Sequence, residues 1–184
     1  MVLAADRYAE QAHPAPRRRR EHAVSKLVAA YIASPEVVAA AALHEAPRHC
    51  GFGELRSRFG EPTARLVAEL SRARICGRAN QHARVAWEAK RLQRLSPAAQ
   101  SIRVAALIQR TQRLLNQPLT LARVGLFQTC AELAALEDAH PVLHSIARKL
   151  CGAASRHLAA GAVQVAWVGT RVELQAGTAR VARP

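Results

Sequence analysis

A histidine and a carboxylate stand side by side in residues 41–50, which read AALHEAPRHC. His44 and Glu45 follow a run of small, helix-forming side chains. Imidazole nitrogens and carboxylate oxygens are both ligands of divalent transition metals, so this pair is typical of half a metal site. Arg48 and His49 come next, and an arginine with a pKa above about 12 can neither bind a metal nor accept a proton. The segment therefore indicates either a working metal centre or the remains of one.

A run of four arginines, residues 17–20, is the second candidate for chemistry. Guanidinium groups bind phosphate oxygens through two parallel hydrogen bonds, so Arg17, Arg18 and Arg19 predict a phosphate-binding segment. The alternative interpretation is an exposed basic loop that has no fixed partner.

The whole chain is strongly basic. Its 184 residues include 27 Lys and Arg against 13 Asp and Glu, a net charge of +14. A surface of this charge attracts polyanions, which leaves nucleic acid, a nucleotide polyphosphate and an acidic protein as possible partners. A solvated arginine-rich surface with no dedicated ligand is the alternative. The charge also does not predict an oligomeric state.

The remaining composition favours a cytoplasmic protein of one domain. The four cysteines, Cys50, Cys76, Cys130 and Cys151, are far apart, which argues against structural zinc and against a disulfide scaffold. No window resembles a membrane span of about 20 apolar residues, and the N-terminus does not resemble a signal peptide. We therefore expect free thiols and no membrane partner.

Helix-start signals recur along the chain and predict the elements that position these residues. Ser34 and Ser96 each precede a proline, as an N-cap residue precedes the first helical turn. Further boundaries are expected near residues 60–62, 116–118 and 140–141. The pattern predicts an all-α fold of eight or nine helices. Residues 161–184 alternate weakly in polarity, which indicates short strands or a mobile, irregular extension.

Five segments in order resemble one family: AEQAHPAPRRRREHA, VVAAAALHEAPRH, GELRSRFGEPTARLVAELS, SPAAQSIRVAALIQRT and LEDAHPVLHSIA. Together they are similar to the HD-domain hydrolases of the RelA/SpoT type, in particular the small alarmone hydrolases, over about residues 4 to 152. The resemblance implies an HD-domain helical bundle over residues 1–155 and a C-terminal extension of unknown role over residues 156–184. It also implies removal of the 3′-pyrophosphate from guanosine tetraphosphate or pentaphosphate with manganese.

The metal positions of the family are only partly kept. His22 and His44 stand at the two histidine positions, Glu45 replaces an aspartate, and Ala106 replaces the distant aspartate. One interpretation is a weak site of two histidines and one carboxylate. The other is two histidines that bond to the backbone or to each other. The resemblance implies Mn²⁺, whereas the lost ligands favour a protein without bound metal.

The catalytic positions are replaced by basic residues, so no catalytic residue is expected. The family's Glu-Asp pair falls on Arg48 and His49, and its asparagine falls on Arg110. Its Arg-Arg-Lys cluster falls on Arg17, Arg18 and Arg19. We therefore predict a nucleotide or phosphate site formed by these three arginines with Arg48 and Arg110.

Three functions stay open. The first is a catalytically impaired relative that binds guanosine polyphosphate or another anionic nucleotide and acts as a regulatory module. The second is an active metal-dependent phosphohydrolase with a rearranged site, in which His49 or His82 is the base. The third is a basic helical protein that binds nucleic acid, which the net charge supports.

Overall fold

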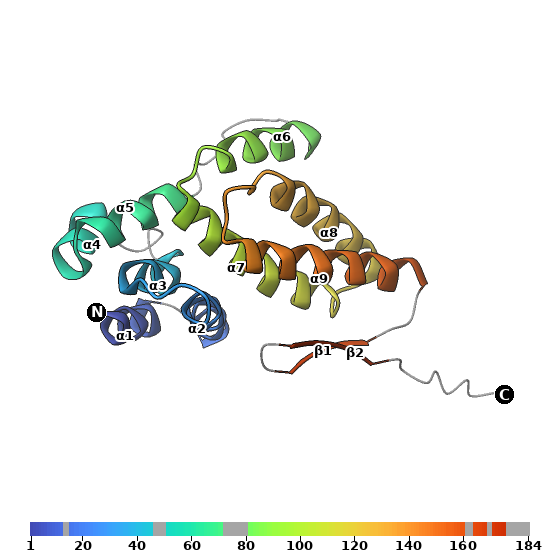
Figure 1. Cartoon of the computed structure of the whole chain (residues 1–184), viewed down its shortest axis with the longest axis horizontal. Coiled ribbons are helices and arrows are strands. Elements are labelled where there is room, and N and C mark those ends of the chain that lie inside the picture. Colours follow the sequence, from blue (N-terminus) through green and yellow to red (C-terminus); the bar gives the residue numbers. More distant parts are fainter. Residues whose placement is uncertain (13–14, 46–50, 72–80, 161–163, 169–170, 176–184) are drawn as a thin grey trace.

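The computed structural model describes residues 1–12, 15–45, 51–71, 81–160, 164–168 and 171–175. In these residues the chain forms nine helices and then one β-hairpin (Figure 1), which confirms the predicted all-α fold of eight or nine helices. The helices are α1 (Val2–Ala12), α2 (Ala15–Ala29), α3 (Pro35–Leu43), α4 (Phe52–Phe59), α5 (Glu61–Leu70), α6 (Gln81–Leu92), α7 (Pro97–Leu114), α8 (Leu119–Ala134) and α9 (Pro141–Ala160). None of the helices in the described ranges has the length and apolar character that a bilayer crossing requires.

The C-terminal residues contain the short strands that their alternation predicted. Strand β1 (Gln164–Val168) pairs antiparallel with β2 (Arg171–Gln175), and Trp167 stands opposite Val172. The preceding helix α9 continues to Ala160, five residues past the expected domain boundary at residue 155. The last turn of this helix therefore lies within the predicted extension.

The helix starts follow the local signals. Ser34 Oγ accepts a hydrogen bond from the backbone N–H of Val37, and Ser96 Oγ accepts one from Ala99, each at 3.4 Å. Proline at the following position suits the first turn, because its missing N–H has no intrahelical partner there. These caps confirm the predicted beginnings of α3 and α7.

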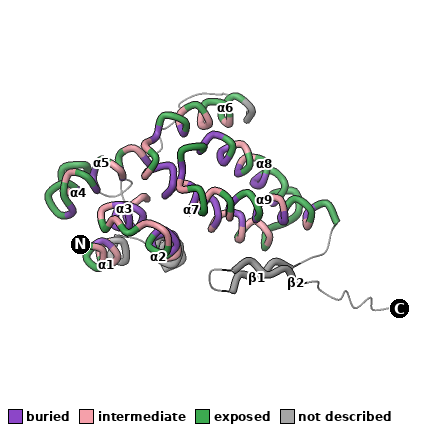
Figure 2. The backbone as a smooth tube through the Cα atoms, in the orientation of Figure 1, coloured by how far each residue is buried: buried purple, intermediate pink, exposed green. Residues whose placement is uncertain are grey.

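Helices α3 and α7 form the centre of the molecule. Every residue of α3 from Val37 to Leu43 is buried, and small alanine side chains let α1, α2 and α5 pack closely around it. Helix α7 contacts α2, α3 and α5 as well as α8 and α9, so it joins the N-terminal helices to the C-terminal pair. Figure 2 shows the buried residues along α3 and on the inner sides of α7, α8 and α9.

The Glu69 carboxylate connects the end of α5 to the beginning of α7 through hydrogen bonds. Glu69 Oε2 accepts hydrogen bonds from Ser96 Oγ at 2.7 Å and from the Ser96 N–H at 3.0 Å. Arg91 Nη1 donates to the Glu69 carbonyl at 3.0 Å. Ser96 therefore caps α7 and also joins two helices.

Replacing Ser96 by alanine is expected to lower the free energy of unfolding by about 1–2 kcal/mol, because it removes the cap of α7 and the bond to Glu69. The matched control is Ser57→Ala, since the exposed Ser57 hydroxyl bonds only the Glu54 carbonyl within its own helix. The control is expected to change stability by less than about 0.5 kcal/mol. Urea unfolding followed by circular dichroism measures both, and equal losses would contradict the capping role.

Candidate functional site

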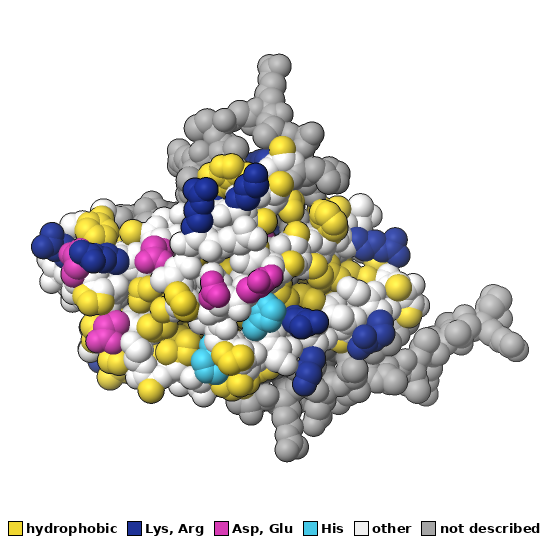
Figure 3. Space-filling model, turned by 45° about the horizontal axis from the view of Figure 1, so that its top comes forward, with side chains coloured by type: hydrophobic (Ala, Val, Ile, Leu, Met, Phe, Trp, Pro, Cys, Tyr) yellow, Lys and Arg dark blue, Asp and Glu magenta, His cyan; other side chains and the backbone are white. Residues whose placement is uncertain are grey.

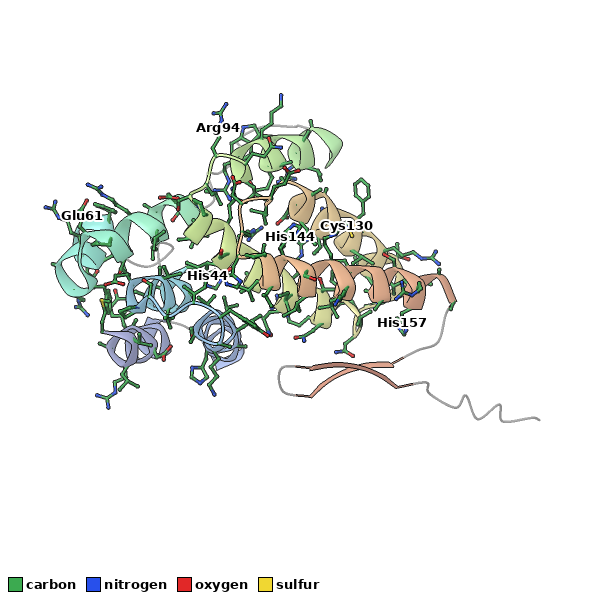
Figure 4. All side chains as sticks on the ribbon, in the orientation of Figure 1. His44, Glu61, Arg94, Cys130, His144 and His157 are labelled. Atoms are coloured by element: carbon green, nitrogen blue, oxygen red, sulfur yellow. The ribbon has the colours of Figure 1, made fainter. Side chains whose placement is uncertain are left out.

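His44 lies at the C-terminal end of α3, in the middle of the molecule (Figure 4). Its Nδ1 is 2.8 Å from the carbonyl oxygen of Ala41. A carbonyl only accepts hydrogen bonds, so Nδ1 carries a proton. Helix α3 ends here, and the half-buried ring is held by its own last turn. The orientation of His44 is therefore determined by local structure.

His22 lies on α2 and faces a carboxylate of α1. Its Nδ1 is 3.8 Å from Asp6 Oδ1, and half of the side chain is exposed. Ser25 Oγ donates to the same Asp6 oxygen at 3.4 Å and contacts the His22 carbonyl at 3.1 Å. Sequence analysis did not predict Asp6 as a partner, because only the packing of α1 against α2 brings the two residues together.

The predicted metal ligands do not form a complete site in the part of the chain that is described. No group of three or more His, Cys, Asp or Glu side chains there could hold a metal ion. His22 stands against Asp6, and Glu45 follows α3 as a half-buried residue. Ala106 is partly buried on α7, packs against the hydrophobic core and offers only a methyl group. The described residues alone therefore do not complete a site for a divalent cation.

Arg110 is held by α8 through a buried carboxylate. Its Nη1 is 3.1 Å from Glu132 Oε1, and its Nη2 donates to Gln128 Oε1 at 2.7 Å. Glu132 is 7% exposed and also accepts a hydrogen bond from Arg103. Arg103 in turn lies 3.8 Å from Glu88 on α6. Arg110 is thus paired with a carboxylate that it shares with Arg103, in a network that connects α6, α7 and α8.

The other predicted anion-binding residues are only partly described. Arg17, Arg18 and Arg19 lie in the first turns of α2, so the expected basic loop is helical instead. Arginine has a high helix propensity, and Pro16 is tolerated in a first helical turn. The side chains of these arginines are not described. Arg48 and His49 lie outside the described residues, and the side chain of His82 is not described either.

A groove beside α9 is a feature that sequence analysis missed. It has a volume of about 670 Å³, within the range typical of ligand sites. Among its described lining residues, three permanent cations stand against one carboxylate. The lining consists of Glu137, Ala139, Pro141, His144, Ser145, Arg148, Lys149, Gly152 and Arg156. From Pro141 onward, the three- and four-residue spacing of these residues is the sequence signal that places them on one face of α9.

The groove is formed by α9 and by the residues that immediately precede it. His144 Nε2 is 3.2 Å from the Leu133 carbonyl, which orients this ring at the start of α9. Arg148, Lys149 and Arg156 are exposed. Figure 3 shows Lys and Arg side chains interleaved with hydrophobic ones over one face of the molecule. The groove thus combines open access with a local excess of positive charge, which favours an anionic ligand.

Comparisons with known proteins agree with this architecture. A family model of the HD domain matches residues 1–122. The chain has no significant match among curated proteins. Its fold is similar to the solved structure of a metazoan ortholog of SpoT that hydrolyzes ppGpp and plays a role in starvation responses. The TM-score is 0.72 at 16% sequence identity, and the similarity covers 85% of this chain and 96% of that chain. At this identity the similarity shows a shared fold.

Proposed function

This chain belongs to the HD-domain family, and from that premise we propose that it binds a guanosine polyphosphate or another anionic nucleotide without hydrolysing it. HD domains are generally metal-dependent, and Ala106 is the observation that carries the proposal. Where the family resemblance implies an aspartate ligand, the α7 helix carries a methyl group that packs against the core. With one anionic ligand missing, metal affinity falls, and the metal supplies neither charge nor an activated water.

The proposed binding of an anion is supported by local charge. Arg148, Lys149 and Arg156 line one groove, and their excess over Glu137 attracts phosphate groups. Arg17–Arg19 and Arg48 are the second proposed contact region, on α2 and after α3. Arg110 contributes less to this proposal than its position in the sequence implied, because its guanidinium already pairs with Glu132.

A second candidate, metal-dependent hydrolysis at a rearranged site, is favoured by the two histidines. Metal-binding histidines usually donate their second ring nitrogen to a carboxylate or a carbonyl. His22 Nδ1 faces Asp6 at 3.8 Å, and His44 Nδ1 bonds the Ala41 carbonyl at 2.8 Å. The His44 ring is therefore held as a ligand ring would be, and the His22 ring has a carboxylate nearby. Turnover that requires manganese distinguishes this candidate from the first.

The deciding experiment measures pyrophosphate release from guanosine tetraphosphate, with and without Mn²⁺, by the purified chain and by His44→Ala. We expect no release above background from either protein, because the fourth ligand position is an alanine. Manganese-dependent release that disappears in His44→Ala would support the second candidate and contradict the first.

Nucleotide binding is tested separately by titrating guanosine tetraphosphate into the double variant Arg148→Ala/Lys149→Ala. Loss of two charged contacts is expected to weaken binding at least about tenfold. The control removes the same charge elsewhere, in Arg58→Ala/Arg65→Ala, whose arginines pair with Glu54 at 3.3 Å and Glu61 at 2.8 Å. If both variants weaken binding equally, the effect comes from net charge and the groove is not the site.

A further inference from the structure

Helices α8 and α9 run antiparallel and in contact, and two side-chain contacts define how they align. Near one end of the pair, His144 Nε2 of α9 is 3.2 Å from the Leu133 carbonyl of α8. Near the other end, Arg123 Nη2 of α8 donates to the Leu158 carbonyl of α9 at 3.1 Å. Between these two contacts, residues at matching positions of α8 and α9 therefore lie next to each other.

Two of the residues between these contacts are cysteines. Cys130 of α8 is exposed and Cys151 of α9 is buried, and the alignment of the two helices places them opposite each other. Figure 4 labels Cys130 on α8, beside α9. Thr111 Oγ1 on α7 lies 3.8 Å from Cys151 Sγ, and either atom can be the donor. The buried thiol is thus held from α7 while it faces the exposed one.

We propose that Cys130 and Cys151 are a thiol pair that a hydroperoxide converts to an intramolecular disulfide, linking α8 to α9. The Cys130 thiolate attacks one oxygen of hydrogen peroxide; an S–O bond forms, the O–O bond breaks, and the leaving hydroxide is protonated to water. The Cys151 sulfur then attacks the sulfur of the Cys130 sulfenic acid. The S–S bond forms, the S–O bond breaks, and the Cys151 proton leaves with the hydroxide as a second water. The two thiols lose two electrons, which reduce the peroxide.

The roles of the two thiols follow from their surroundings. Cys130 is accessible to an oxidant, whereas Cys151 is only 6% exposed. The hydrogen bond from Cys151 lowers the pKa of Cys130 to about 7. The same bond, together with burial, raises the pKa of Cys151. At neutral pH, Cys130 is therefore the nucleophile and Cys151 is the resolving thiol.

The test uses the full chain with Cys50→Ser and Cys76→Ser, so that only the two proposed thiols remain, and circular dichroism verifies its helical content. After treatment with hydrogen peroxide, intact mass is expected to fall by two hydrogen atoms. The alkylating reagent is then expected to label neither Cys130 nor Cys151. Reduction with dithiothreitol is expected to restore the labelling of both. A monomer on a non-reducing gel places the bond within one chain.

The matched variant is Cys151→Ala in the same background, because alanine removes both the resolving sulfur and its hydrogen bond. This variant is expected to accumulate a sulfenic acid at Cys130 that dimedone traps. Alkylation of Cys130 at pH 7 is expected to slow by about tenfold as its pKa returns towards about 8.5. Three outcomes would overturn the proposal. In the parent protein, Cys130 is oxidised while Cys151 stays free, or the disulfide links two chains. Alternatively, Cys130 is alkylated at the same rate in the parent and in Cys151→Ala. The proposed disulfide does not rest on nucleotide binding, and none of these outcomes depends on it.

Discussion

Replacing Glu132 by alanine is expected to lower the free energy of unfolding by about 3 kcal/mol, the lower end of the range for breaking a buried ion pair. Glu132 is 7% exposed and receives hydrogen bonds from Arg103 and Arg110. Its removal leaves two guanidinium groups on α7 without their shared carboxylate. Because the side chains of these arginines are 14% and 25% exposed, water offsets part of the loss. Urea unfolding measures the change.

The control for this prediction is a surface carboxylate with the same kind of partners. Glu61 pairs with Arg56 at 2.7 Å and with Arg65 at 2.8 Å, but its side chain is 36% exposed and the two arginines are exposed. Glu61→Ala is expected to cost less than about 1 kcal/mol.

A double-mutant cycle that combines Glu132→Ala with Arg110→Ala measures the interaction free energy between these two side chains. Removing both Arg110 and Glu132 is expected to destabilise the protein by less than the sum of the single losses, because the double variant leaves one fewer uncompensated charge. Additive losses would show that the two residues do not interact energetically.

A variant with Glu45→Asp, Arg48→Glu, His49→Asp and Ala106→Asp is expected to bind Mn²⁺ at least about 100-fold more tightly than the natural chain. The substitutions restore the carboxylates that the family resemblance implies, on the fold that this chain shares with a ppGpp hydrolase. Isothermal titration measures the affinity for Mn²⁺. Pyrophosphate release from guanosine tetraphosphate shows whether the restored site is active.

Thermal unfolding provides a readout of this variant that does not depend on activity. Without metal, the carboxylate at the partly buried position 106 is expected to cost about 1–3 kcal/mol, and Mn²⁺ is expected to raise Tm. The control places Asn instead of Asp at position 106, with the other three substitutions kept. It has the same size without the charge, so its metal affinity should stay low. A folded variant that binds no Mn²⁺ would mean that these positions do not correspond to the family's ligands.

Much of the fold could be predicted from the sequence because its signals are local. The caps at Ser34 and Ser96 stand where the serine–proline pairs predicted helix starts. The alternation after residue 160 predicted strands that pair as a hairpin. Residues 17–19, for which a basic loop was one interpretation, lie in a helix, because arginine has a high helix propensity.

Of the candidate site, the sequence by itself determined which chemical groups are present and which are missing. It carries histidines at 22 and 44 and no carboxylate at 106, whatever the chain folds into. The tertiary structure decided what those groups contact. Asp6 stands by His22, Glu132 pairs with Arg110, and each partner lies on another helix. Such contacts depend on the angles and spacings at which helices pack, which follow from the side chains of the whole core, and no local stretch of sequence encodes them.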